Sequence, residues 1–268
     1  PTFHKSYIVQ IEYTILRQNM QALSLKKLLQ HPHSVFEQLH GAAVAALAGD
    51  MAVLGAHHDV LVDGGLVHAP GQQLVLAQAG AVLGGAGIAG AKGDMAGGAA
   101  VAAAIYALAA NEVKVNVAGV TPMCENRISP SALVPGDVIG SYGGKKIEIC
   151  NTDAEGRLIL ADAMAYMVKD EHADRVIDIA TLTGAVVGML GFSTAGLLSD
   201  DDAFCGAFLK AAQTSGERYW RLPIFEEQKQ MIESKIADIK NMGRDYCGTI
   251  TAGLFIQAFA QEIGRAHV

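Results

Sequence analysis

Two carboxylates and a guanidinium stand at alternate positions in one short stretch: Asp153, Glu155 and Arg157 lie within residues 151–158 (NTDAEGRL). If that stretch is extended, side chains at alternate positions leave the same face of the chain. Neighbouring carboxylates repel each other unless a cation lies between them, and their hard oxygens suit zinc, manganese or magnesium. The guanidinium would then bind an oxyanion or carboxylate beside the metal ions. The alternative is a solvated turn with a surface ion pair.

A second acidic segment, residues 92–100 (KGDMAGGAA), places Asp94 just before a helix that we expect to run to about Ala110. The small residues at its start would let this helix lie close against a sheet. From the residues alone, Asp94 is an acidic group favoured by the positive end of the helix dipole.

A third polar segment, His57-His58-Asp59, follows a short buried strand expected at Ala52–Ala56. Imidazole and carboxylate groups are common metal ligands, although a histidine pair at the end of a strand is more often part of a polar loop. Asp63 comes next, where a carboxylate meets a flexible Gly-Gly turn. A peptidase built on the two histidines is a weak hypothesis, because no second histidine motif supports it.

Strand-like and helix-like patterns alternate along the chain. Strands are expected at Tyr7–Tyr13, Val113–Val120, Lys146–Cys150 and Val176–Ala180, and helices at Leu158–Lys169, Ala203–Thr214 and Thr249–Ala260. A hairpin turn is expected at Ser141–Lys145. This alternation predicts an α/β fold with a central, largely parallel sheet covered by helices on both faces, and a site at the C-terminal ends of its strands.

Composition argues against several partners. The net charge of −7 and the lack of a basic stripe disfavour nucleic acid. The most apolar stretches, residues 41–49 and 81–91, are too short and Gly-rich to span a membrane. The 4 cysteines form no C-x-x-C pair, which favours reduced thiols in a cytoplasmic protein. No signal peptide is visible, and the chain starts at Pro1 rather than Met.

The stretch NTDAEGRL resembles the signature of the leucyl aminopeptidase (cytosol aminopeptidase) family at every position. KGDMAGGAA resembles the family's second metal-binding segment, K-x-D-M-x-G-[AG]-A, and Asp94 and Asp153 are 59 positions apart, as in the family. Residues 181–185 (TLTGA) resemble a wall of its substrate site, although Thr183 would equally suit a helix cap. Further matches are residues 220–223 (WRLP) and 236–241 (IADIKN). The resemblance runs from residue 92 to about residue 262.

This resemblance implies a metal-dependent aminopeptidase that removes leucine-like N-terminal residues from peptides. It implies two divalent ions, zinc or manganese and in some members magnesium, bound by Asp94, Asp153 and Glu155 and completed by Asp63. Arg157 corresponds to the catalytic residue that holds a bicarbonate, the proton shuttle for the attacking water. The family also implies peptide substrates and assembly into a homo-oligomer, a hexamer.

The match is loose upstream of residue 92. The family's first metal segment, V-G-K-G-x-T-F-D-[ST]-G-G, has Asp63 in the place of its aspartate and His58 near its metal-binding lysine. No lysine occurs between Lys27 and Lys92, so the family's catalytic lysine has no counterpart there. An alternative therefore stays open: a catalytically impaired family member, or a fragment, that acts as a structural or oligomeric subunit.

The chain accordingly divides into three parts. Residues 1–50 form an unassigned N-terminal segment, and residues 51–262 form an incomplete aminopeptidase catalytic domain. Residues 263–268 have two open interpretations, the start of the family's final segment or a translated sequencing adapter, and are left out of the fold prediction.

Overall fold

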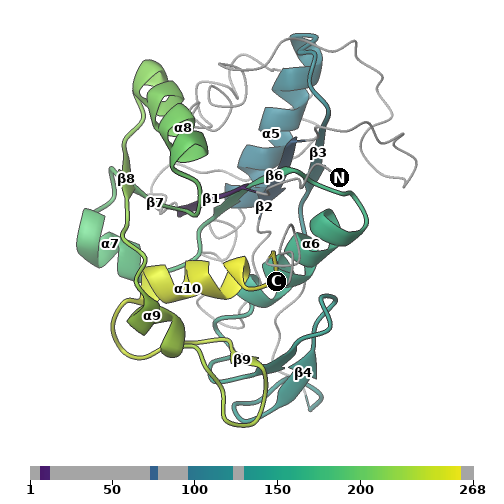
Figure 1. Ribbon diagram of the computed structural model, residues 1–268, viewed down its shortest axis with the longest axis vertical. Helices are drawn as coiled ribbons and strands as arrows, with labels where there is room; N and C mark the ends of the chain where they lie inside the picture. The colour runs from purple at the N-terminus through teal and green to yellow at the C-terminus, as the bar shows by residue number, and fades with distance from the viewer. Residues whose placement is uncertain (1–6, 13–72, 78–95, 123–129, 261–268) are drawn as a thin grey trace, which may run out of the picture.

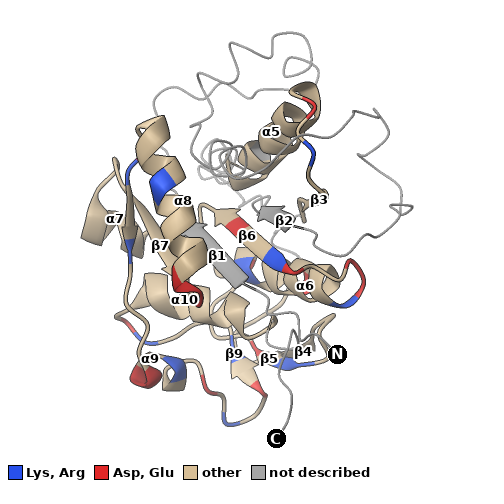
Figure 2. Cartoon of the chain, turned by 45° about the horizontal axis from the view of Figure 1, so that its top comes forward, with Lys and Arg blue, Asp and Glu red and all other residues tan. Residues whose placement is uncertain are grey.

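The computed structural model describes residues 7–12, 73–77, 96–122 and 130–260 (Figure 1). The described elements are β1 (Tyr7–Glu12), β2 (Gln73–Ala77), α5 (Ala96–Ala110), β3 (Val117–Val120), β4 (Val138–Gly140), β5 (Lys146–Glu148), α6 (Gly156–Lys169), β6 (Arg175–Ala180), α7 (Ala185–Leu190), β7 (Ala195–Ser199), α8 (Asp202–Ser215), β8 (Tyr219–Arg221), α9 (Glu226–Gln230), β9 (Ile239–Lys240) and α10 (Gly248–Gln257). None of the helices in these ranges is long and apolar enough to cross a membrane. Basic and acidic residues are dispersed over several of the described elements (Figure 2).

A six-stranded sheet with the order β3-β2-β6-β1-β7-β8 forms the centre of the fold. Strand β6 pairs in parallel with β1 on one side and with β2 on the other. The β2–β3 and β7–β8 pairs are also parallel, whereas β1 and β7 are antiparallel. The predicted α/β class is therefore confirmed, and the sheet is parallel except at the β1–β7 pair.

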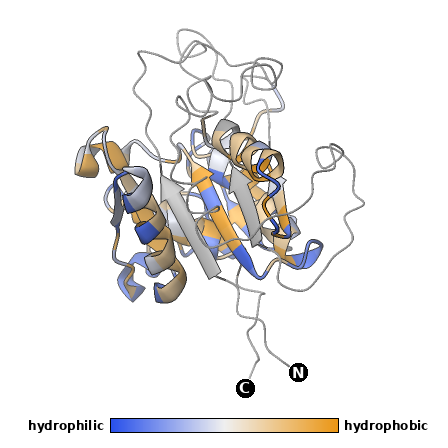
Figure 3. Ribbon diagram, turned by 90° about the horizontal axis from the view of Figure 1, so that it is seen from above, coloured by the Kyte–Doolittle hydropathy of each residue, from blue (hydrophilic) through white to orange (hydrophobic). Residues whose placement is uncertain are grey.

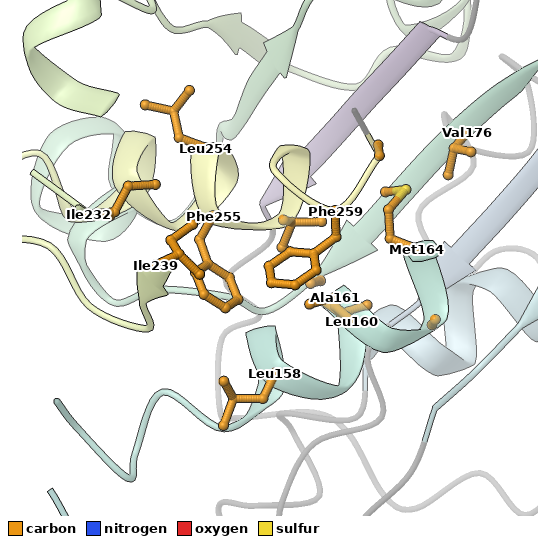
Figure 4. Close-up of a cluster of buried hydrophobic side chains, with 14 of the residues drawn as sticks. Leu158, Leu160, Ala161, Met164, Val176, Ile232, Ile239, Leu254, Phe255 and Phe259 are labelled. Atoms are coloured by element: carbon orange, nitrogen blue, oxygen red, sulfur yellow. The ribbon is translucent and has the colours of Figure 1, made fainter. Parts of the chain in front are cut away.

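Helices cover both faces of this sheet, as predicted, because β6 alternates its side chains between two cores. On one face, Ile177 and Ile179 pack in a cluster with residues of α5 and α8; Figure 3 looks onto the sheet from this side. On the other face, Val176 and Ala180 pack in a cluster with residues of α6 and α10 (Figure 4). Phe255 is central to that second cluster and is fully buried.

A second, three-stranded sheet has the order β4-β5-β9; along the chain, β4 and β5 lie between β3 and β6 of the first sheet. Strands β4 and β5 form the hairpin that was predicted at Ser141–Lys145, and β9 pairs in parallel with β5. The Asp238 carboxylate accepts a hydrogen bond from the Lys146 amide over 2.7 Å, which fixes this pairing at its start. The hairpin and its strand at Lys146–Cys150 were predicted, whereas β9, with two residues, is too short to show alternation and was not.

Helix α5 starts in close contact with the C-terminal end of β6. A Cβ atom at Gly97 would overlap the Ile179 carbonyl oxygen and would lie 2.9 Å from the Ala180 Cα atom. Both of these atoms belong to the backbone, so they cannot move aside as a flexible side chain would. The expectation that small residues let this helix lie close against the sheet is thus confirmed.

We predict that Gly97→Ala destabilises the fold by about 1–3 kcal/mol, because the added methyl group overpacks a backbone contact. The matched control is Gly206→Ala in α8, where an added Cβ would meet nothing within 4 Å. That change should stabilise the protein by about 0.5–1 kcal/mol, because alanine loses less backbone entropy in a helix. Urea unfolding of both variants measures the difference, and equal shifts would contradict the predicted contact.

Strand β6 also carries a buried acid, Asp178. It is fully buried, and neither carboxylate oxygen forms a hydrogen bond with any residue that the structure describes. By its place in the strand it shares a face with Val176 and Ala180. Burial disfavours the charged form and raises the pKa of this carboxyl from 3.8 to about 8.

The raised pKa makes stability depend on pH in a definite direction. The folded chain holds the Asp178 proton more tightly than the unfolded chain, so this group destabilises the fold progressively as pH rises from 3.8 to about 8. We predict that Asp178→Asn, which stays neutral, unfolds at a higher urea concentration than the parent chain above pH 8. The advantage should shrink as pH falls toward 4. A difference that does not change with pH would show that the pKa of Asp178 is the same in the folded and the unfolded chain.

Candidate functional site

The acidic signature, residues 151–158, follows β5 of the second sheet and leads into α6, which precedes β6 of the central sheet. Thr152 and Asp153 form a turn in which the Asn151 side-chain oxygen accepts a hydrogen bond from the Asp153 amide over 2.9 Å. The Asn151 carbonyl accepts a second bond from the Ala154 amide over 3.3 Å. Glu155 is already helical, with φ −76° and ψ −35°, and caps α6.

The extended conformation predicted for this stretch is therefore wrong. Asparagine side chains readily bond to the backbone amide two residues ahead, and this local bond turns the chain before the helix begins. As a result the three side chains differ in environment: Asp153 is exposed, Glu155 is half-buried and Arg157 is buried. They do not share the face of a strand. The two carboxylates instead lie just before the start of α6.

The start of a helix is a favourable place for negative charge. The free amides of the first turn and the helix dipole stabilise nearby carboxylates by roughly 0.3–1 kcal/mol each. Within the described residues, Asp153 makes no side-chain hydrogen bond or ion pair, so its oxygens are open to solvent and to a ligand. The turn thus presents hard oxygen donors at a position that tolerates their charge.

Arg157 lies behind these carboxylates in the first turn of α6 and is only 8 % exposed. Its Nη1 atom donates a hydrogen bond to the Asn241 carbonyl over 2.9 Å. This bond ties the start of α6 to the segment that follows β9. The role of the guanidinium in holding an anion stays a prediction.

The other predicted ligands, Asp63 and Asp94, lie outside the described residues, as does the segment His57-His58-Asp59. Only two of the four predicted metal ligands, Asp153 and Glu155, can therefore be placed. Among the described residues no group of three or more His, Cys, Asp or Glu side chains is arranged to hold a metal ion.

The segment TLTGA follows β6 directly and leads into α7. The Thr183 hydroxyl lies 3.1 Å from the Thr249 hydroxyl, at the start of α10. Gly184, not Thr183, is the N-cap of α7, and no side chain caps that helix. The predicted helix cap by Thr183 is therefore wrong, and this hydroxyl instead connects the end of β6 to α10.

Sequence patterns predict no role for Asn241, which is fully buried and hydrogen-bonded to the signature turn. The only signal for it was its place in the family-like segment IADIKN. Nothing in composition or periodicity distinguishes a buried asparagine from one in a polar loop.

Comparison with known proteins identifies the group to which this site belongs. The sequence profile of the cytosol aminopeptidase family, catalytic domain, matches residues 80–268. The chain belongs to the cytosol aminopeptidase family. Asp94, Asp153, Glu155 and Arg157 fall within the matched range, whereas Asp63 falls before it.

Curated relatives and solved structures agree with this family. The probable cytosol aminopeptidase of Clostridium perfringens is 50 % identical over 183 residues, which are 68 % of this chain and 37 % of the relative. A mutant of tomato leucine aminopeptidase matches 94 % of this chain and 46 % of its own, at 31 % identity and a TM-score of 0.66. The bottromycin maturation enzyme BotP in complex with Mn matches 85 % of this chain and 56 % of its own, at 30 % identity and a TM-score of 0.65. The chain thus spans little more than a third of the length of the curated relatives.

Proposed function

We propose that this chain carries the catalytic centre of a metal-dependent aminopeptidase that removes leucine-like N-terminal residues from peptides. The observation that carries the proposal is the signature turn, in which Asp153 and Glu155 flank the start of α6 with Arg157 buried behind them. The names of the relatives, cytosol and leucine aminopeptidases, support the same reaction class.

The described residues fit a divalent metal. Asp153 offers an exposed carboxylate, Glu155 a half-buried one, and carboxylate oxygens are suitable ligands for zinc, manganese or magnesium. Two ions would be held by these residues together with Asp94 and Asp63, and the BotP complex with Mn supports manganese as one of them. When bound, such ions polarise the scissile carbonyl and lower the pKa of a water molecule.

The chain's own residues would bind and orient the peptide around this centre. The carboxylates of Asp153 and Glu155 would hold the ions beside the free α-amine at the peptide's N-terminus, and the first turn of α6 stabilises their charge. Arg157 is held in place by the Asn241 carbonyl, so its planar fork is preset for a bicarbonate ion that relays the proton of the attacking water. Residues 181–185, at the end of β6, form a wall for the substrate side chain.

Hydrolysis of leucine p-nitroanilide, with metal content measured on the same sample, tests the proposal. Asp153→Ala should lose bound manganese or zinc in elemental analysis and should lose metal-dependent turnover. The matched control is Glu227→Ala, which removes an exposed carboxylate from the first turn of α9 and should change neither quantity. Because no lysine lies between Lys27 and Lys92, we expect turnover below the common enzyme range of about 1–10³ per second.

The outcomes separate the hypotheses. A parent chain that retains no divalent metal would contradict the metal centre. A chain that retains metal and shows no turnover at all would support the structural or oligomeric subunit considered from the sequence. Metal content that is the same in Asp153→Ala and in the parent would remove Asp153 from the ligand set.

We predict further that Arg157→Lys is not a conservative change. Lysine carries a point charge without the bidentate fork, so bicarbonate should stimulate the parent chain more than the variant. Arg221→Lys is the control, since Arg221 pairs with Asp202 over 2.6 Å at a partly exposed position in β8. Equal stimulation of all three proteins would leave Arg157 with a structural role only.

Assembly into a homo-oligomer, a hexamer in the family, stays a proposal for this chain. Light scattering on the purified protein measures its mass directly. A monomer at micromolar concentration would contradict it.

A further inference from the structure

The end of β5 leaves a partly buried stretch of backbone, residues 150–154, without a strand partner. The β5–β9 pairing ends at Glu148 and Lys240, and the next residue, Asn241, donates its amide to the Glu148 carbonyl over 2.9 Å. Beyond Glu148 the chain leaves β5 and continues into the signature segment, residues 151–158. Buried amide and carbonyl groups are costly unless they are paired, so residues 150–154 need partners from elsewhere.

The side chain of Asn241 supplies these partners. Its Oδ1 atom accepts hydrogen bonds from the amides of Cys150, over 2.8 Å, and Asn151, over 3.3 Å. Its Nδ2 atom donates to the carbonyls of Asn151, over 2.7 Å, and Ala154, over 3.4 Å. Asn241 is 0 % exposed; its bond to Ala154 is buried and the other three are partly buried.

The residue type is specific for this task. Only a side-chain amide offers an acceptor and two donors side by side; aspartate lacks the donors and leucine lacks both. Ala154 matters most, because its carbonyl lies in the chain between Asp153 and Glu155. A bond to it fixes the backbone that separates the two carboxylates. The main-chain carbonyl of the same asparagine binds Arg157, so a single residue contacts both sides of the turn.

We propose that Asn241 is the positioning residue of the metal-binding turn. It sets the backbone of residues 150–155 so that the carboxylates of Asp153 and Glu155 keep a fixed separation before any metal arrives. The metal-affinity part of this inference rests on the proposed metal centre, whereas the ordering of the turn does not. Asn241 touches no reacting group and acts through the backbone of the ligands.

The first test is amide hydrogen exchange of the full chain without metal. In Asn241→Ala, exchange should accelerate at least tenfold in the peptide that covers residues 150–155 and should stay unchanged in β6 and α10. The control is Gln228→Ala. Gln228 is also a buried amide, 7 % exposed, and it accepts a bond from the Phe225 amide over 2.8 Å, away from the signature. This control should leave residues 150–155 protected.

The second test is manganese affinity by isothermal titration. Loss of a residue that orients metal ligands typically weakens affinity by about 10–100-fold, and Asn241→Ala should fall in that range. Gln228→Ala should bind as the parent does. A weaker affinity combined with faster exchange at the turn supports positioning. Unchanged affinity with faster exchange overturns it, because the turn would then be ordered by the metal itself.

Two further results keep the inference falsifiable. If Asn241→Ala does not fold, exchange in the parent chain decides: the Cys150 amide should exchange as slowly as the Ile149 amide, which bonds to the Asp137 carbonyl over 2.8 Å. Fast exchange at Cys150 would overturn the proposal. If the parent binds no manganese, the proposed function fails, and metal-free exchange alone still confirms or overturns the role of Asn241 in ordering the turn.

Discussion

The hydrogen bonds between Asn241 and the signature turn are the constraint on which the arrangement of the site depends. A strand that ends inside a protein must leave its next backbone groups paired, and a side-chain amide is a compact way to do this. Because Asn241 directly follows β9, and β9 pairs with β5, the small sheet brings it to the signature. The small sheet therefore serves to orient the chain at the entrance to α6.

The central sheet provides the second half of the site through β6. Its alternating side chains separate two hydrophobic cores, and its C-terminal end meets both the start of α5 and the segment TLTGA. The close contact at Gly97 fixes the first turn of α5 against that end. The packing around β6 therefore reaches from the first turn of α5, through Gly97, to the segment that leads into α7.

The sequence predicted the elements with long, regular patterns and missed those set by single contacts. Helices α6, α8 and α10 and strands β1 and β6 lie where periodicity placed them. Strand β2 was missed because residues 73–77 sit in a Gly- and Ala-rich stretch without clear alternation. The signature was read as extended, since its alternating charges mimic a strand, and the side-chain bond of Asn151 that bends it leaves no periodic trace. The role of Asn241 depends on a contact across about 90 positions, which no local pattern records.

The electrostatics of the turn favour a cation even before metal ligands from elsewhere are counted. Two carboxylates and one guanidinium lie within residues 153–157, which leaves this segment with an excess of negative charge. The charged groups differ in burial: Asp153 is exposed, whereas Arg157 is buried where the effective dielectric constant is low. The free amides at the start of α6 favour the negative charge of these carboxylates. The helix dipole acts in the same direction. The proposed metal centre would therefore form on an anionic turn whose backbone hydrogen bonds to Asn241 are made without any metal.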